Sequence, residues 1–125
     1  LQIDPEYGPA LLRLGLVYND ARRYEESAQC ARRVAEREPT NAAAHALLAE
    51  ALYGQEKFEE AAVSAESAVK VSPNFSVALY TAGLARASLR QRDVALAHLD
   101  RLRQLNSPAL AQQLSEFIDK KAPAK

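Results

Sequence analysis

The residues that could take part in catalysis or metal binding are few and far apart in this 125-residue sequence. The two histidines, His45 and His98, have no CxxC, HxxxH or carboxylate cluster around them. A metal site needs several ligands at defined spacing, and His45 lies in a position expected to pack, so a structural histidine is favoured. The single cysteine, Cys30, has no basic neighbour fixed beside it that would make a reactive thiolate. We therefore expect no catalytic residue, no metal and no cofactor.

Other motifs with a chemical mechanism are also missing from the sequence. It contains neither a glycine-rich phosphate-binding loop nor a nucleophile elbow. The paired arginines at 22–23 and 32–33 are followed closely by glutamates, which indicates a solvated, ion-paired helix face. Sixteen basic residues balance 16 acidic residues, so the net charge favours neither nucleic acid nor an anionic membrane. The sequence predicts a protein that is not an enzyme and does not bind nucleic acid.

Apolar residues are too dispersed for a membrane span. A membrane-spanning helix needs about 20 consecutive apolar residues, and no apolar run in the sequence approaches that length. We therefore expect no membrane insertion and a soluble protein, with the cytoplasm favoured. A signal peptide would have been lost if the chain is a fragment. The single cysteine excludes an internal disulfide and leaves the redox compartment open.

The chain is organised by an internal repeat. Pro5, Pro39 and Pro73 are spaced 34 positions apart, and two further sets keep the same step: Gly15, Ala49 and Gly83, then Tyr24, Phe58 and Arg92. A fixed period of this length is typical of stacked supersecondary units. Apolar residues make up 48% of the chain and aromatic residues only 6%. This composition suits a helical protein.

Each unit reads as two amphipathic helices. In the first helix of the first unit, an apolar stripe recurs at i, i+3, i+4 and i+7, at Leu11, Leu14, Gly15 and Tyr18. The second helix has a matching stripe at Tyr24, Ser27, Ala31 and Val34. Residues 19–21 form the predicted turn, and a proline stops the second helix.

This period and these positions resemble the tetratricopeptide repeat family. The small residues at 15, 49 and 83 match the family slot where two backbones approach closely. The resemblance implies an all-α right-handed superhelix of antiparallel helix pairs, with repeats at 8–41, 42–75 and 76–108. Leu11, His45 and Leu79 stand where the family favours Trp, and Arg86 and Arg92 replace an aromatic residue or Leu. We therefore expect the third repeat to be looser or to abut something different.

The two ends of the chain differ from a repeat. Residues 1–7 resemble the end of a truncated upstream repeat. A fourth repeat would need a small residue one full repeat interval after Gly83, but Phe117 is there. Residues 109–120 are therefore predicted to form a capping helix, which covers the last apolar face of a solenoid. Residues 121–125 are predicted to be a disordered tail.

In this family the first helices of the repeats line a concave groove. The corresponding residues lie on one stripe of each helix, at i, i+4 and i+7. They are Leu12, Leu16 and Asn19, then Ala46, Glu50 and Tyr53, then Tyr80, Leu84 and Ala87. Five of them, namely Leu12, Leu16, Tyr53, Tyr80 and Leu84, would form an exposed apolar surface of the kind that marks an interaction site. The alternative is that the superhelix or an adjoining repeat partly buries them.

The resemblance also bears on the partner. Some members hold the acidic C-termini of heat-shock chaperones with a clamp of Lys, Asn and Arg side chains. The matching positions in this chain are Leu12, Leu16, Leu47, Val77 and Thr81. That carboxylate clamp is absent. We expect a non-catalytic module that binds a protein or peptide segment, as part of a larger scaffold or assembly factor. The alternative is a structural spacer, which could form a homo-oligomer through an open N-terminal edge.

Overall fold

A computed structural model describes residues 7–124. The described chain is helical and contains no strand. The helices are α1 (Tyr7–Asp20), α2 (Tyr24–Arg37), α3 (Ala42–Gly54), α4 (Phe58–Val71), α5 (Ser76–Ser88), α6 (Arg92–Gln104) and α7 (Pro108–Lys121). Among these residues, no helix is long and apolar enough to cross a membrane. The sequence prediction for residues 1–6, the end of an upstream repeat, lies outside the described residues.

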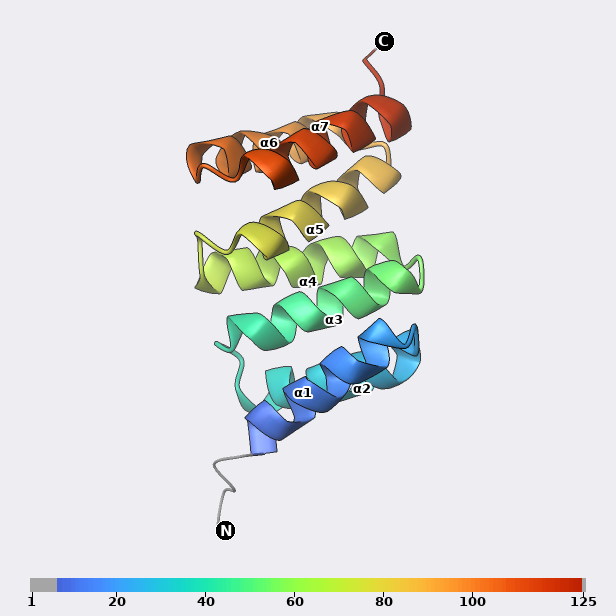
Figure 1. The fold of residues 1–125 in the computed structure, drawn as a ribbon, viewed down its shortest axis with the longest axis vertical. Helices are drawn as coiled ribbons and strands as arrows, with labels where there is room; N and C mark the ends of the chain where they lie inside the picture. Colours follow the sequence, from blue (N-terminus) through green and yellow to red (C-terminus); the bar gives the residue numbers. More distant parts are fainter. Residues whose placement is uncertain (1–6, 125) are drawn as a thin grey trace.

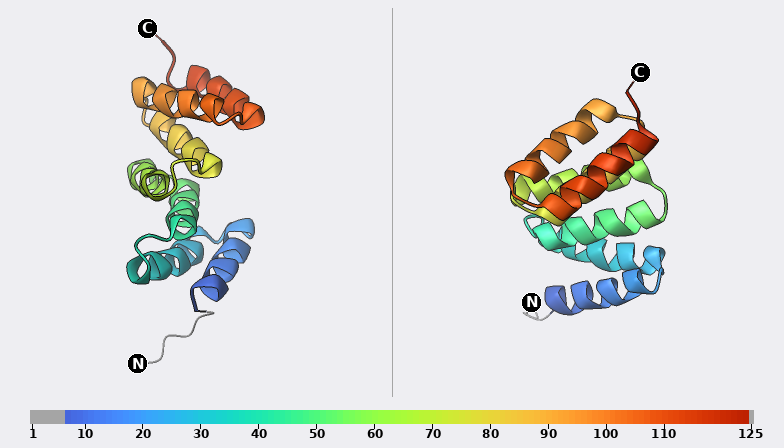
Figure 2. Two further views of the ribbon diagram at one scale, coloured as in Figure 1. Left: turned by 90° about the vertical axis from the view of Figure 1, so that its left-hand side faces the viewer. Right: turned by 45° about the horizontal axis from the view of Figure 1, so that its top comes forward.

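The helices stack in chain order into a right-handed solenoid with two layers (Figure 1). In the left view of Figure 2, α2, α4 and α6 lie on one side of the stack. The odd-numbered helices contact one another in the order α1, α3, α5 and α7, whereas no two even-numbered helices do so within residues 7–124. A curved stack packs more tightly on its inner side. The odd-numbered layer is therefore the concave one.

The turns inside the helix pairs share one geometry. Arg22, Glu56 and Arg90 recur at the repeat interval, and their φ angles are 62°, 61° and 62°. At the first of these turns, the amide of Arg23 donates to the carbonyl of Tyr18 and the amide of Arg22 donates to that of Asn19. This is the Schellman pattern, which satisfies the last carbonyls of a helix. It reverses the chain within a short turn and holds each pair antiparallel.

Small residues let the helices approach closely, as the repeat pattern predicted. Ala49 is fully buried in a cluster with Ala65 and Ala82. A Cβ atom built on Gly15 would lie 2.7 Å from Cδ2 of Leu47, and one built on Gly83 would lie 2.5 Å from Cδ2 of Leu114. These distances are shorter than real carbon contacts, so a larger side chain at either glycine would force neighbouring residues to move.

The capping helix packs as predicted, but the spacing that leads to it is shorter than the repeat interval. The residues that precede α3, α5 and α7 are Asn41, Phe75 and Ser107, so the last interval is 32 and not 34. In this shorter register Ser115, not Phe117, occupies the small slot of Gly15, Ala49 and Gly83. The apolar stripe of α7 falls on Ala111, Leu114 and Ile118, which are all buried. This stripe closes the cluster formed by α5 and α6.

The two arginines that depart from the repeat pattern make specific contacts. Arg86 Nη2 donates to Glu66 Oε1 on α4 at 2.7 Å, and Arg86 Nε donates to Glu66 Oε2 at 3.0 Å. His98 Nε2 is 2.9 Å from the same Oε2. Arg92 Nη1 donates to the carbonyl of Ala122 at 2.8 Å. At Arg86 and Arg92 the third repeat therefore makes polar contacts, where the repeat pattern has an aromatic residue or Leu.

The start of the predicted tail is packed and not disordered. Ala122 follows α7 and is 4% exposed, because the guanidinium of Arg92 holds its carbonyl against α6. Pro123 and Ala124 are exposed, and residue 125 lies outside the described range. The capping helix, at Pro108–Lys121, extends one residue beyond each predicted end.

Candidate functional site

The inner layer is hollowed by two adjoining cavities between α1, α3 and α5, which together we call the concave groove. The tyrosine cavity has a volume of about 350 Å³ and is lined by Asn19, Tyr24, Glu50, Tyr53, Gly54, Val77, Tyr80, Thr81 and Leu84. The leucine cavity has a volume of about 180 Å³ and is lined by Leu12, Leu16, Ala43, Ala46, Leu47, Glu50, Phe75 and Val77. Glu50 and Val77 border both cavities, so the two form one continuous depression.

The structure brings together nearly all the groove residues proposed from the sequence. Leu12, Leu16 and Ala46 line the leucine cavity, Asn19, Tyr53, Tyr80 and Leu84 line the tyrosine cavity, and Glu50 lines both. Ala87 is the exception. It is fully buried in the cluster formed with α6 and α7, because the capping helix covers this end of α5. Ala87 therefore has no surface to offer a partner.

The groove residues are less exposed than the sequence pattern suggested. Leu16 is 49% exposed, whereas Leu12, Tyr53, Tyr80 and Leu84 are only partly exposed. Adjoining helices cover part of these side chains. For example, the ring of Tyr53 packs against the tilted ring of Phe58, with the ring centroids 5.3 Å apart. Both tyrosines still line the cavity.

Sequence reasoning missed several lining residues, of which Val77 is the most informative. Val77 is 43% exposed and lines both cavities. It precedes Tyr80 by three positions, so it lies one turn earlier on the same stripe. In the same way, Ala43 precedes Ala46 by three positions and lies on the stripe of α3. Tyr24 and Phe75 could not be found in this way, because they lie at the start of α2 and before α5.

Two hydroxyl groups in the groove already have hydrogen-bond partners within the described residues. The hydroxyl of Tyr80 donates to Gln113 Oε1 at 3.2 Å, and the hydroxyl of Thr81 donates to the carbonyl of Val77 at 3.0 Å. Asn19 is different, because its Oδ1 atom is buried and has no hydrogen-bond partner within the described residues. A buried acceptor without a donor is uncommon and needs an explanation.

Glu50 is the one charged residue lining either cavity. Burial raises the pKa of its carboxyl group, and the negative charge of Asp20 raises it further. No described residue forms a hydrogen bond or ion pair with Glu50. The groove therefore combines apolar walls with an uncompensated acidic group.

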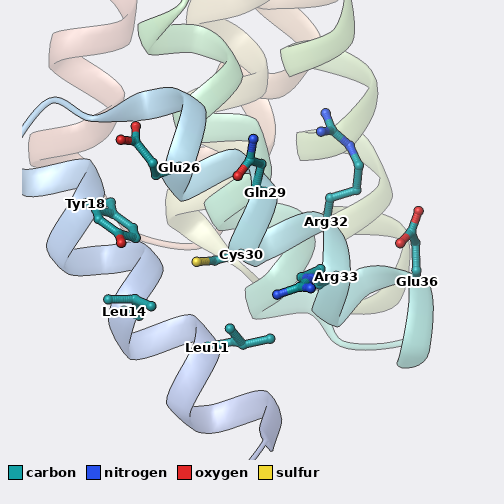
Figure 3. A pocket seen from close by; sticks show the side chains of 9 residues that line it. All are labelled: Leu11, Leu14, Tyr18, Glu26, Gln29, Cys30, Arg32, Arg33 and Glu36. Carbon is teal, nitrogen blue, oxygen red and sulfur yellow. The ribbon is translucent and has the colours of Figure 1, made fainter.

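A second depression lies at the N-terminal end of the solenoid, between α1 and α2, and we call it the open edge. Its volume is about 490 Å³, and Figure 3 shows Leu11, Leu14 and Tyr18 of α1 facing Cys30 and Arg33 of α2. Leu14 was predicted to pack but is 43% exposed. In the next repeat, the equivalent residue Leu48 is 8% exposed in a cluster that includes α2.

The open edge contains the only cysteine. Burial raises the pKa of the Cys30 thiol, and the nearby charge of Arg33 only partly opposes this effect. The thiol therefore remains protonated at neutral pH and is a poor nucleophile. Among residues 7–124, no three His, Cys, Asp or Glu side chains are grouped so that they could hold a metal ion.

Comparisons with known proteins agree with this architecture. Residues 9–41 match the model of the tetratricopeptide repeat. The chain is similar to the first TPR domain of Spaghetti (RPAP3) bound to an HSP90 peptide, with 21% identity, a TM-score of 0.84 and coverage of 94% of each chain. It is also similar to the TPR2B domain of yeast Sti1 in a complex with pHsp70, with 21% identity, a TM-score of 0.84 and coverage of 93% of this chain and 96% of that chain.

A further solved structure, the Sgt2 TPR domain from Aspergillus fumigatus, gives 21% identity and a TM-score of 0.85, and the alignment covers 94% of this chain and 80% of that chain. No curated protein matches the chain in sequence. At these identities the likeness establishes the fold alone. Within residues 7–124, the chain has the fold of three tandem tetratricopeptide repeats followed by a capping helix, and the family model itself matches the first repeat.

Proposed function

We propose that the concave groove binds a segment of a partner protein without catalysis, as one part of a larger scaffold or assembly factor. The observation that carries this proposal is the continuous depression across α1, α3 and α5. It is walled by leucine and tyrosine side chains that are at least partly exposed within the described residues. Tyr53 and Tyr80 suit such a surface, since each supplies a large apolar ring and a hydroxyl that can still hydrogen-bond. The protonated Cys30 thiol offers no activated nucleophile, which also favours a non-catalytic role.

The segment that we propose is not the acidic C-terminus of a heat-shock chaperone. The Spaghetti domain was solved with the HSP90 peptide SRMEEVD, which carries three acidic residues. In this chain Leu12, Leu16 and Leu47 line the leucine cavity, and none of them can pair with a carboxylate. Glu50 adds a like charge that repels one.

Replacing Tyr53 and Tyr80 together by Ala should weaken binding of a groove ligand by roughly 2–4 kcal/mol, because truncating two central aromatic anchors removes most of their contact. The probe is a labelled peptide selected against the wild-type protein from a library of random peptides. Its affinity is measured by fluorescence anisotropy. Circular dichroism checks that the helices are intact.

Two further variants make this test specific. Replacing Arg32 and Arg33 by Ala changes the same number of residues on the exposed face of α2 and should leave the affinity unchanged. Leu16→Glu should weaken binding without a loss of packing, because Leu16 is 49% exposed. If no peptide can be selected, or if only the arginine variant loses the peptide, the groove is not the binding site.

The open edge supports a second candidate function, which is self-association of a structural spacer. The observation in its favour is that Leu14 and Val17 of α1 are 43% and 63% exposed, although their equivalents in α3, Leu48 and Ala51, are buried. Replacing Leu14 and Val17 by Glu should then abolish concentration-dependent association in sedimentation velocity. A wild-type protein that stays monomeric at every concentration contradicts the spacer and leaves the groove proposal intact.

A further inference from the structure

The chemistry of the groove restricts what its ligand can be. The leucine cavity is lined by apolar side chains and Glu50, and the tyrosine cavity adds uncharged polar groups, so Glu50, which borders both cavities, is the one charged residue lining them. None of the residues lining either cavity is Lys, Arg or His. A carboxylate surrounded by apolar walls experiences a lower effective dielectric constant than one in water, so its attraction for a cation is stronger there.

Glu50 is a charged hydrogen-bond acceptor in the groove that lacks a donor within the described chain. The Tyr80 and Thr81 hydroxyls already donate to Gln113 and to a backbone carbonyl. No described residue pairs with the carboxylate of Glu50, which borders both cavities, whereas the unpaired Oδ1 atom of Asn19 is itself buried. Glu50 therefore needs a donor that a side chain of a bound segment can supply.

The charges and rings around Glu50 also favour a cation. Asp20 on α1 adds a second negative charge close enough to raise the pKa of the Glu50 carboxyl group. Tyr24, Tyr53 and Tyr80 line the same cavity from α2, α3 and α5. The face of an aromatic ring attracts a guanidinium or ammonium group. The groove therefore carries negative charge, whereas a groove that holds an acidic peptide needs positive charge.

We propose that the segment bound in the concave groove carries a basic side chain, with arginine the best fit, which pairs with Glu50 while apolar side chains on either side of it fill the two cavities. This inference rests on the proposed function and specifies the ligand. Arginine fits better than lysine because its planar guanidinium can pair with a carboxylate through two N–H groups and can stack on the face of an aromatic ring. Its flanking apolar residues distinguish the segment from a polybasic tail.

The experiment selects phage-displayed random peptides against the wild-type protein, Glu50→Gln and Glu60→Gln. Glu60 is an exposed glutamate on α4 that lines neither cavity, so its variant is the matched control. The wild type and Glu60→Gln should both enrich peptides in which Arg or Lys is flanked by apolar residues. Glu50→Gln should still select apolar peptides but lose the basic residue, because Gln keeps the shape of Glu without its charge.

One selected peptide then isolates the charged pair by calorimetry. Replacing its arginine with citrulline, which is neutral and nearly isosteric, should weaken binding to the wild type by roughly 10- to 100-fold, the range expected for a charge-assisted hydrogen bond. The same replacement should change binding to Glu50→Gln only slightly. Circular dichroism confirms that the variant is folded.

The outcomes separate this inference from the proposed function. Apolar peptides selected without a basic residue, or with an acidic one, overturn the inference and leave the groove as the binding site. A basic preference that persists in Glu50→Gln also overturns it, since the cation is then bound elsewhere. If no peptide is enriched by any of the proteins, the proposed function itself fails.

Discussion

Deleting residues 108–125 should unfold or aggregate the domain, because the capping helix supplies one side of a core cluster. Leu114 and Ile118 are fully buried against α5 and α6. Fully burying a side chain of this size contributes about 1.5–3 kcal/mol, so these two residues account for a large part of a total stability of roughly 5–15 kcal/mol. The deletion also exposes Leu79, Leu99 and Leu102, which are at most 1% exposed in the intact chain.

A pair of single substitutions gives the same test in a chain that still folds. Leu114→Ala should lower the free energy of unfolding by roughly 2–5 kcal/mol, because it removes buried contacts and leaves a cavity. Lys120→Ala changes an exposed residue of the same helix and should have almost no effect. Both values come from urea unfolding followed by circular dichroism. A truncated chain that stays monomeric with an unchanged melting temperature contradicts the capping role of α7.

Arg86→Ala should destabilise the domain by about 2 kcal/mol, because it leaves the Glu66 carboxylate half-buried without its bidentate partner. The side chains of Arg86 and Glu66 are 14% and 29% exposed, so solvent screens the pair only in part. The control is Arg23→Ala, which breaks an exposed i,i+3 pair with Glu26 and should cost little. Equal urea midpoints for the two variants would show that the Arg86 pair contributes nothing.

The Arg86–Glu66 pair also predicts how the difference in stability between wild type and Arg86→Ala depends on pH. Burial raises the pKa of Glu66, but the hydrogen bonds from Arg86 and His98 outweigh it, so the pKa lies below its ordinary value of 4.5. A group with a depressed folded-state pKa stabilises the protein above its unfolded pKa, and this contribution is lost as the pH falls through the folded value. The difference in stability between wild type and Arg86→Ala should therefore be full at neutral pH and shrink at pH values well below that ordinary pKa.

The helices and the inner surface could be predicted because they depend on residue type at a fixed spacing. Gly15, Ala49 and Gly83 mark the close contacts, and the stripe that contains Tyr53 and Glu50 follows from helical periodicity alone. The turns could not be predicted in the same way. Arg22, Glu56 and Arg90 share a left-handed backbone but not a side-chain type, so their common role appears only in the backbone angles.

The remaining errors concern positions whose surroundings are set by another helix. Leu14 carries the same pattern as Leu48, yet no described helix covers it. Ala87 continues the groove stripe in sequence, but it is buried in the cluster that α5 forms with α6 and α7. Arg86 breaks the apolar pattern and is accommodated by Glu66 on α4. The periodicity of one helix does not indicate which other helix packs against it.

Binding in the concave groove is the central claim, and a chemical-shift titration tests it most directly. A peptide selected against the wild-type protein is titrated into the isotope-labelled chain, and the amide shifts are mapped onto the helices. We expect the largest changes on the inner layer, at Leu16, Glu50, Tyr53, Tyr80 and Leu84. Changes confined to α2, α4 and α6, or to the open edge around Leu14 and Cys30, would contradict the claim.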